Sequence, residues 1–431
     1  MLRSLRRSFW FFKAFLEKYL KVIILSLVLG ISAARFGHLL PTPKKTLKVG
    51  LVGRYTTENL PMDVLSKISR GLVKTNSDGS PSPDLAESWE IKEEEKLYIF
   101  HLKKGIFWQD ETPLKAKDVR YDLEDIEIRT KNDHILEFTL KEPFSPFPNI
   151  LSQPIFKKGL LGVGKYKVTA IKSSGKFIQS IKLTNEETSL IYKFYPTEKA
   201  AILGFKLGEV NRLEKITNIS DLENWPKIRV IPEIDYRQFV AVFYNTKSSQ
   251  FSQKTIRQAL TYALKKPSDE TRALGPFNPN SWAYNSQVKP YEQDILKAKS
   301  LLEEAEVKNL EIELATTFSQ LPFAETIKNS WEESGIKTKI KVVSTLPETF
   351  QAFLASQEIP ADPDQYTLWH STQSTNITGY NNPKIDKLLE DGRKISDEEE
   401  RKAIYLDFQR FLVEDTPAAF LFYPTVYTII R

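Results

Sequence analysis

Apolar and polar positions along residues 47–431 follow the period of strands in some segments and that of helices in others. Apolar residues at every second position predict strands with one face on a core, at 97–102, 135–140 and 310–315. Short apolar runs predict further strands at 47–52, 236–245, 336–343 and 416–423. The run at 236–245 is the most continuous of these, which predicts a strand that is buried on both faces.

Helices are predicted between these strands, at 64–73, 252–265, 294–304 and 323–334, with two more near the C-terminus. The first of those two has Asn382 as N-cap, Pro383 in its first turn and Gly392 beyond its end. The second has a capping box of Ser396 and Glu399. The strand–helix–strand order over 310–343 predicts a parallel strand pair joined by a right-handed crossover. The chain is therefore expected to fold as an α/β protein.

The net charge of +6 belongs to the N-terminal arm. Residues 1–46 contain nine lysines and arginines and one glutamate, so they carry +8 and the remaining body carries −2. No basic face is left for nucleic acid, and we expect no nucleic-acid partner. The whole chain is 41% apolar and 27% charged, as is usual for a folded soluble protein.

The N-terminal arm has the anatomy of a targeting segment. A basic region, residues 1–21, precedes thirteen uncharged residues, Val22 to Ala34. One interpretation is a cleaved signal peptide with its cleavage site at Ser32–Ala34; the other is a membrane anchor over residues 22–40, with a linker at 41–46. Both interpretations place the body outside the cell membrane, because the basic region stays inside. The anchor is the interpretation we favour.

Catalytic and metal-binding motifs are missing from the sequence. There are no cysteines, so neither a disulfide framework nor a thiolate site can form. The four histidines are scattered, and neither HExxH nor GxSxG occurs. We expect the protein not to be an enzyme and to use no metal or other cofactor.

Three linked segments resemble the signature region of the family 5 extracellular solute-binding proteins, the oligopeptide-, dipeptide- and nickel-binding components of ABC importers. They are LAESWE at 85–90, FHLKKG at 100–105 and TPLKAKDV at 112–119. Later segments agree in the same order: GVGKYKV at 162–168, IRQAL at 256–260, KAKSLL at 297–302 and NITGY at 376–380. The resemblance covers nearly the whole body.

The resemblance implies a two-lobe fold of the periplasmic-binding-protein type II class, with mixed sheets flanked by helices and hinge crossovers between the lobes. Lobe I is expected at residues 47–235 together with 417–431, and lobe II at 236–416. It further implies a monomer that closes on a peptide or similar small solute in the interlobe cleft and delivers it to a membrane permease. Hinge closure would follow from ligand contacts that exist only in the closed state.

The sequence departs from the family pattern in two places. Only fifteen residues separate Val119 from Ile135, where larger members carry an extra subdomain, so lobe I is expected to be reduced. Around residues 356–364, relatives have about ten more residues, including a strand and, in some, the carboxylate that binds a peptide's ammonium group. Asp362 or Asp364 either replaces that carboxylate or serves as a helix cap or turn residue.

Candidate ligand-binding residues follow from the resemblance and from residue chemistry. Aromatic faces bury varied peptide side chains, so aromatic residues near the expected cleft are candidates for its walls. Each of these aromatic residues could equally belong to the hydrophobic core. The candidates are Tyr55, Trp282, Asp362, Asp364, Trp369, Asn376 and Tyr380. Two alternatives stay open: a non-peptide solute such as a nickel chelate or a sugar, and a membrane-anchored sensor that has kept the fold without transport.

Overall fold

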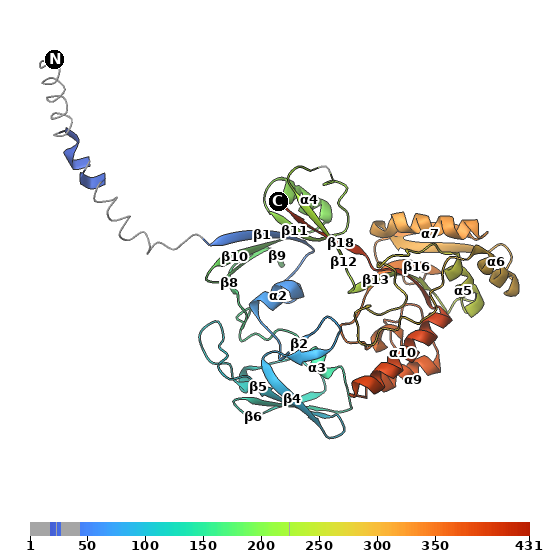
Figure 1. Ribbon diagram of the computed structural model, residues 1–431, viewed down its shortest axis with the longest axis horizontal. Helices are drawn as coiled ribbons and strands as arrows, with labels where there is room; N and C mark the ends of the chain where they lie inside the picture. The colour runs from blue at the N-terminus through green and yellow to red at the C-terminus, as the bar shows by residue number, and fades with distance from the viewer. Residues whose placement is uncertain (1–17, 23, 27–43, 224) are drawn as a thin grey trace, which may run out of the picture. The chain divides into compact units, whose positions relative to one another are not determined.

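The computed structural model describes residues 18–22, 24–26, 44–223 and 225–431 (Figure 1). The chain divides into two units, residues 1–46 with 186–189 and residues 47–185 with 190–431. In the first unit, the Lys45 amide donates to the Glu187 carbonyl (3.3 Å). None of the helices in the described ranges is both long and apolar enough to span a bilayer. Most of the expected anchor at 22–40 lies outside those ranges.

The first sheet has seven strands in the order β12-β18-β11-β1-β10-β9-β8. Their bounds are β1 Lys45–Val52, β8 Lys167–Ser174, β9 Phe177–Thr184, β10 Thr188–Tyr195, β11 Arg212–Ile216, β12 Arg229–Ile234 and β18 Thr425–Ile430. β1 runs parallel to β11, whereas the C-terminal β18 lies antiparallel between β11 and β12. The helices α2 (Met62–Ile68) and α4 (Glu198–Lys206) contribute apolar side chains to the cores of this sheet.

A second, antiparallel sheet of four strands forms a subdomain of the same lobe. Its order is β4-β5-β7-β6, with bounds Ala86–Lys92, Leu97–Leu102, Ile135–Leu140 and Ile126–Asn132 respectively. The predicted strands at 97–102 and 135–140 are thus confirmed, with Tyr98, Phe100 and Phe138 fully buried. The short interval after Val119 supplies the edge strand β6. The hairpin β2 (Val73–Thr75) with β3 (Pro81–Pro83) and the one-turn helix α3 (Phe147–Ile150) complete this subdomain.

Lobe II is built on a five-stranded sheet in the order β15-β14-β16-β13-β17. The strands are β13 Gln238–Tyr244, β14 Glu311–Thr317, β15 Lys337–Val343, β16 Ala352–Glu358 and β17 Ala418–Phe422. Alternate residues of β13 belong to two different cores, which confirms the prediction of burial on both faces. β14 and β15 are parallel, as the strand–helix–strand pattern predicts.

Six helices cover this sheet in the described range. They are α5 Lys254–Ala263, α6 Ile295–Glu304, α7 Leu321–Glu333, α8 Tyr366–Trp369, α9 Pro383–Gly392 and α10 Glu398–Asp415. The predicted cap of α9 is confirmed, since the Asn382 side chain accepts from the Lys384 amide (2.9 Å). The predicted cap of α10 is wrong: Asp397, one residue later, accepts from the Glu400 amide (2.9 Å), while the Ser396 amide is held by Glu95 (3.0 Å).

One prediction on strands needs correction, and another stays a prediction. The strand β16 precedes Asp362 and pairs with β13 on one side and with β14 on the other, and the loss of a further strand around residues 356–364 relative to other family members stays a prediction. Residues 417–431 were expected to belong to lobe I, but β17 at 418–422 pairs with β13 in lobe II. Only β18 joins the first sheet, since two antiparallel neighbours there fix its register.

The chain therefore crosses between the lobes twice. The first crossing joins β12 to β13 through residues 235–237, and the second joins β17 to β18 through residues 423–424. The Asp235 amide donates to the Pro424 carbonyl (2.9 Å), so the two crossings lie side by side. Two adjacent short connections of this kind form the geometry of a hinge.

Candidate functional site

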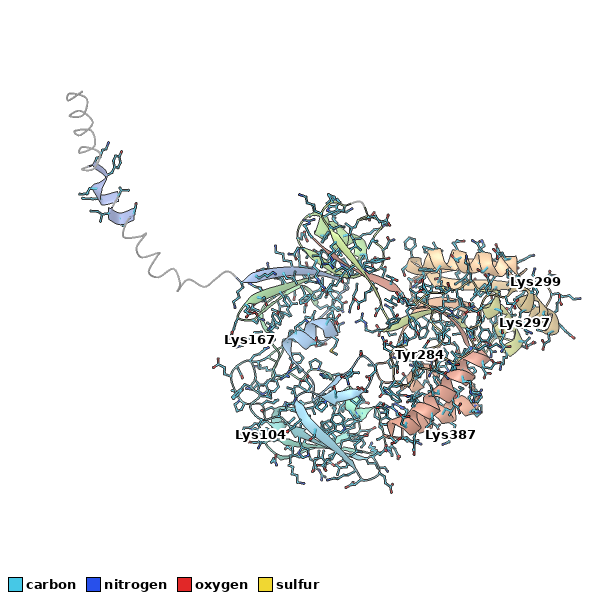
Figure 2. The ribbon with its side chains drawn as sticks, in the orientation of Figure 1. Lys104, Lys167, Tyr284, Lys297, Lys299 and Lys387 are labelled. Carbon is cyan, nitrogen blue, oxygen red and sulfur yellow. The ribbon has the colours of Figure 1, made fainter. Side chains whose placement is uncertain are left out.

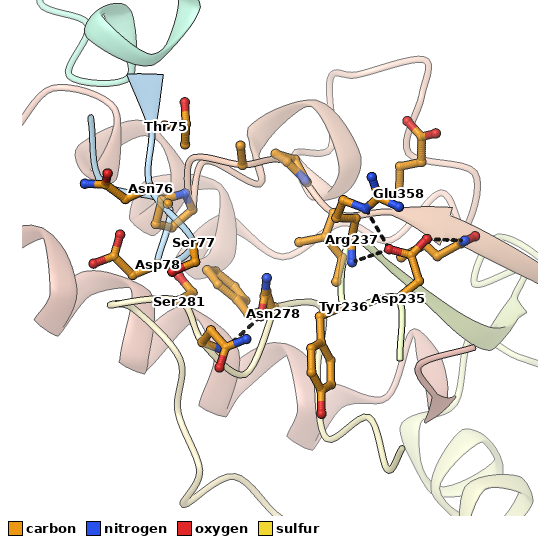
Figure 3. A pocket seen from close by; sticks show the side chains of 18 of the residues that line it. Thr75, Asn76, Ser77, Asp78, Asp235, Tyr236, Arg237, Asn278, Ser281 and Glu358 are labelled. Atoms are coloured by element: carbon orange, nitrogen blue, oxygen red, sulfur yellow. Dashed lines mark hydrogen bonds and ion pairs between the residues drawn. The ribbon is translucent and has the colours of Figure 1, made fainter. Parts of the chain in front are cut away.

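A cavity of about 700 Å³ lies beside the two crossings, and both lobes line it (Figure 3). Its volume is within the range of small-molecule sites, about 300–1,000 Å³. The lining residues come from the β2–β3 turn, β11, the first crossing, the loop after α5, and the end of β16 with the residues that follow it. They are Thr75–Gly79, Lys215, Asp235–Gln238, Phe277, Asn278, Asn280, Ser281, Glu358–Ala361 and Pro363. We refer to this cavity as the hinge cleft.

Asp235 organises the wall at the first crossing. Its carboxylate accepts from Arg237 Nε (2.7 Å) and from Gln238 Nε2 (3.0 Å), and Figure 3 shows these bonds within the wall. Burial acts to raise the pKa of Asp235, but the bonds from Arg237 and Gln238 hold it below its usual value. The Ile359 amide donates to the Arg237 carbonyl (2.8 Å), which ties the end of β16 to the crossing.

The opposite wall is the turn between β2 and β3. Asp78 Oδ1 accepts from the Ser80 amide (2.9 Å) and hydroxyl (2.6 Å), and these two bonds lower the Asp78 pKa. The Asp78 carbonyl accepts from the Trp282 amide of lobe II (3.1 Å). Gly79 has φ +89°, and a Cβ atom there would lie 2.3 Å from the Ala361 carbonyl oxygen. Only glycine fits this approach of the two lobes.

Some of the charged groups of the hinge cleft form ion pairs, and others do not. Lys215 forms an ion pair with Asp63, and Arg237 forms one with Asp235 (2.7 Å). Asp78 and Glu358, one from each lobe, have no cationic partner among the described residues. These two carboxylates, which lack a cationic partner, therefore favour a solute that carries a positive group. Within the described part of the chain, no cluster of three or more metal-ligating side chains occurs.

Three of the candidate residues lie inside lobe II and not in the lining of the hinge cleft. Trp369 is buried and stacks on Phe243 (6.3 Å between centroids). Asn376 Nδ2 donates to the Tyr380 carbonyl (2.9 Å), and Tyr380 Oη donates to Asp415 Oδ2 (2.6 Å). These are the contacts of core residues, and a ligand role for Trp369, Asn376 or Tyr380 stays a prediction.

Tyr55 and Trp282 also lie outside the lining. Tyr55 belongs to lobe I, where its hydroxyl donates to the Val52 carbonyl (3.0 Å) and its ring packs edge-on against Phe194 (5.0 Å). Trp282 adjoins the lining residue Ser281, and the Arg401 guanidinium lies over its indole ring (5.5 Å). Of the four aromatic candidates, Trp282 is thus nearest to the hinge cleft along the chain.

The two acidic candidates are held by arginines of lobe II. Asp362 accepts from both terminal nitrogens of Arg401, with 3.0 Å between Arg401 Nη1 and Asp362 Oδ2. Asp364 forms an ion pair with Arg393 (3.0 Å), and burial raises the pKa of Asp364. Asp362 lies between the lining residues Ala361 and Pro363, but its carboxylate is buried against Arg401. Both carboxylates are thus paired with arginines in this structure, and a ligand role for Asp362 or Asp364 stays a prediction.

The charged lining residues Asp78, Lys215, Asp235, Arg237 and Glu358 were not among the sequence-based candidates. Asp78 belongs to the turn between β2 and β3, Lys215 lies on β11, and the other three lie at strand ends next to a crossing. The sequence feature that could have found them is a polar residue at the end of a strand beside a lobe crossing. This feature identifies lining residues only when the position of the crossing is known.

Comparisons with known proteins agree with this architecture. The family model described as "Bacterial extracellular solute-binding proteins, family 5 Middle" matches residues 80–180 and 188–379. The oligopeptide-binding protein AppA of Bacillus subtilis is 25% identical over 88% of this chain and 86% of its own length. The dipeptide-binding protein of Escherichia coli is 23% identical over 81% of this chain and 82% of its own length.

Solved structures give the same fold. CtaP of Listeria monocytogenes, titled an ABC transporter substrate-binding protein, superposes with a TM-score of 0.77 at 21% identity, covering 90% of this chain and 94% of that one. NikZ of Campylobacter jejuni, solved with Ni(L-His), gives a TM-score of 0.74 at 22% identity with the same coverage of both chains. The predicted two-lobe type II fold is confirmed.

Proposed function

Because the chain belongs to the family 5 bacterial extracellular solute-binding proteins, we propose that it captures a peptide or a similar small solute in the hinge cleft and delivers it to the permease of an ABC importer. The observation that carries this proposal is the position of the cleft, which both lobes line beside the two crossings. A solute bound there contacts both lobes at once. It therefore stabilises the closed arrangement over any open one.

The peptide class is supported by the relatives and by the chemistry of the lining. The Bacillus subtilis and Escherichia coli relatives are named for oligopeptide and dipeptide binding. Asn76, Asn278 and Asn280 bring amide groups to the lining, which can pair with a peptide backbone. The carboxylates of Asp78 and Glu358, which lack a cationic partner among the described residues, suit an ammonium group.

The role proposed here is binding and delivery, without catalysis. The family comprises solute-binding proteins. The partners that this role requires are a solute and the membrane subunits of an importer. We propose that the protein acts as a monomer, as one cleft per chain suffices for capture.

Ligand capture tests the proposal directly. The full-length chain, purified in detergent, is examined by native mass spectrometry for a co-purifying small molecule and then titrated with a mixture of tripeptides while tryptophan fluorescence is recorded. We expect saturable binding that Tyr236→Ala weakens, because Tyr236 lines the cleft, and that Tyr427→Ala on β18 leaves unchanged. Absence of both a bound mass and a fluorescence response to any peptide mixture would overturn the peptide proposal, and a bound non-peptide mass would redirect it.

We further propose that residues 22–40 anchor the body to the outer face of the membrane. The support is the sequence: thirteen uncharged residues follow a basic segment. Since the chain has no cysteine, single cysteines can report sidedness. A membrane-impermeant maleimide should label Lys299→Cys in intact cells and leave Arg6→Cys unlabelled. Release of the body from the membrane as a fragment whose mass matches a chain that starts after Ala34 would indicate a cleaved signal peptide.

A further inference from the structure

A second set of contacts joins the lobes without any covalent crossing. The four-stranded subdomain of lobe I meets lobe II where the turn at Gly79 contacts Ala361. Figure 2 shows the side chains of both lobes. These contacts border the hinge cleft on the side of the β2–β3 turn, whereas residues 235–238 border it at the crossing. The cleft is thus enclosed between the hinge and this junction.

Asn149 on α3 makes the central hydrogen bond of the junction. Its Oδ1 accepts from Thr75 Oγ1 (2.9 Å), and its Nδ2 donates to the Gly79 carbonyl (3.0 Å), both within lobe I. The same Nδ2 donates across the junction to Asp362 Oδ2 (3.1 Å). Two contacts inside lobe I therefore hold the amide in place before lobe II is engaged.

The acceptor in lobe II is held in place independently. Arg401, only 5% exposed, binds the Asp362 carboxylate with both terminal nitrogens, and the Asp364 amide donates to Asp362 Oδ1 (2.9 Å). Arg401 Nε is in turn fixed on the Gly392 carbonyl (2.7 Å). If the lobes separate, Asp362 keeps its arginine, so the bond to Asn149 can break without leaving an unpaired buried charge.

Ser145 makes a second connection close by. Its amide donates to the Arg393 carbonyl (2.7 Å), and its hydroxyl donates to the Gly392 carbonyl (3.2 Å). The Arg393 guanidinium lies between Phe144 of lobe I (4.8 Å) and Tyr366 of lobe II (4.3 Å). Asn149 and Ser145 are both absent from the lining of the hinge cleft.

We propose that Asn149 and Ser145, with their acceptors Asp362, Gly392 and Arg393, form an interlobe latch that holds the cleft closed without contacting the ligand. The inference rests on the proposed function in one respect, that the two crossings act as a hinge. Because the latch stabilises the closed state in the absence of ligand, it sets the fraction of molecules that are closed before a ligand binds. The ligand affinity that is measured scales with the population of the binding-competent state, so the latch tunes affinity from outside the binding site.

The closed fraction without ligand is the quantity to measure. The chain has no cysteine, so Lys104→Cys in lobe I and Lys299→Cys in lobe II, both exposed, can carry a donor and an acceptor dye in the full-length protein. Single-molecule energy transfer then gives the ratio of closed to open molecules. We expect Asn149→Ala to lower this ratio about tenfold, since it removes a hydrogen bond to a charged acceptor.

Two further variants make the result specific. Asn149→Asp keeps the side-chain shape and places a second carboxylate beside Asp362, so it should open the cleft more than Asn149→Ala does. Asn132→Ala in the same subdomain removes only a local bond, from the His134 amide to Asn132 Oδ1 (2.8 Å), and should leave the ratio unchanged. An equal ratio in Asn149→Ala, Asn149→Asp and the unmodified chain would overturn the latch.

A tripeptide mixture in the same assay separates the latch from the proposed function. If tripeptides close the unmodified chain while the Asn149 variants match it without ligand, the latch is overturned and solute capture stands. If the variants open the cleft while no tripeptide changes any chain, the latch stands and peptide capture is overturned. Unchanged thermal unfolding of Asn149→Asp confirms that opening is not loss of the fold.

Discussion

At the scale of single residues, the site is defined by which charges have partners. Lys215 and Arg237 reach the hinge cleft already paired with carboxylates, whereas Glu358 and Asp78 reach it unpaired. Asp362 is also acidic and lies next to the cleft, but its carboxylate is bound to Arg401. Residue type alone would not distinguish these carboxylates, whereas their partners do.

Glu358→Gln should weaken the binding of peptides with a free amino terminus about three- to tenfold, because one charge-assisted contact is lost. N-acetylated peptides should lose little, since they have no ammonium group. Isothermal titration calorimetry measures both, with Glu348→Gln, an exposed glutamate of the same lobe, as the matched control. Equal losses for free and acetylated peptides would contradict the assignment of Glu358 to an ammonium group.

Asp362→Asn should lower the free energy of unfolding by about 3–5 kcal/mol, because the buried Arg401 guanidinium loses its counter-charge. Asp407→Asn breaks an exposed pair with Arg410 and should cost less than about 1 kcal/mol. Urea unfolding followed by circular dichroism compares the two variants. Similar values for both would show that Asp362 is not structurally bound to Arg401.

At the scale of elements, buried side chains fix helix ends to one another within lobe II. Arg257 on α5 donates to the carbonyls of Phe251 (2.8 Å) and Asp415 (2.6 Å), which fixes the start of α5 to the end of α10. These bonds give Arg257 a structural role within lobe II. The α10 cap itself lies one residue from its predicted place.

Asp397→Ala should destabilise the protein by about 1 kcal/mol, since it removes the N-cap of α10. Ser396→Ala should change the free energy of unfolding by less than about 0.5 kcal/mol, because Asp397 and not Ser396 makes the N-cap bond of α10. Chemical denaturation of both variants separates the two possible caps. A larger loss for Ser396→Ala would restore the capping box that the sequence suggested.

Lys266 follows α5, and burial lowers the pKa of its ammonium group to about 7. The unfolded chain then binds more protons than the folded chain between about pH 7 and pH 10, so stability should rise with pH across that window. Lys266→Met should flatten the rise, whereas Lys265→Met, an exposed neighbour, should keep it. Urea midpoints between pH 6.5 and 9.5 test this, and an unchanged slope in Lys266→Met would contradict it.

At the scale of the whole molecule, two crossings and one latch connect two independently built lobes. Lobe I buries its apolar side chains around its own two sheets, and lobe II buries its own on both faces of the five-stranded sheet. Because each lobe has its own core, the relative position of the lobes depends on few contacts. A ligand in the hinge cleft can therefore change that position at small cost.

A bound solute should stabilise both lobes together. At a ligand concentration one hundred times the dissociation constant, the added stability is about 2.7 kcal/mol, which corresponds to an increase in Tm of a few degrees for a chain of this size. Differential scanning calorimetry with and without a saturating tripeptide measures it. A shift confined to one of two resolved transitions would show that the ligand contacts a single lobe.

The sequence predicted the elements and the fold well because both depend on local signals. The alternation at 97–102 and the apolar run at 236–245 specify strands through periodicity, whichever other elements surround them. The three segments within 85–119 identify the family for a related reason, since each is a short stretch of sequence. The errors at Ser396 and at residues 418–422 concern boundaries and sheet partners, which depend on neighbours.

What only the tertiary structure decided is the identity of the cleft. Asp362 was a candidate ligand residue by sequence and is bound to Arg401, while Glu358, four residues earlier, lines the cavity unpaired. Asn149, far from Asp362 in the chain, completes the junction beside it. A carboxylate's availability is set by the groups that fold against it, and the sequence does not specify these pairings, because they join segments that come together only in the folded protein.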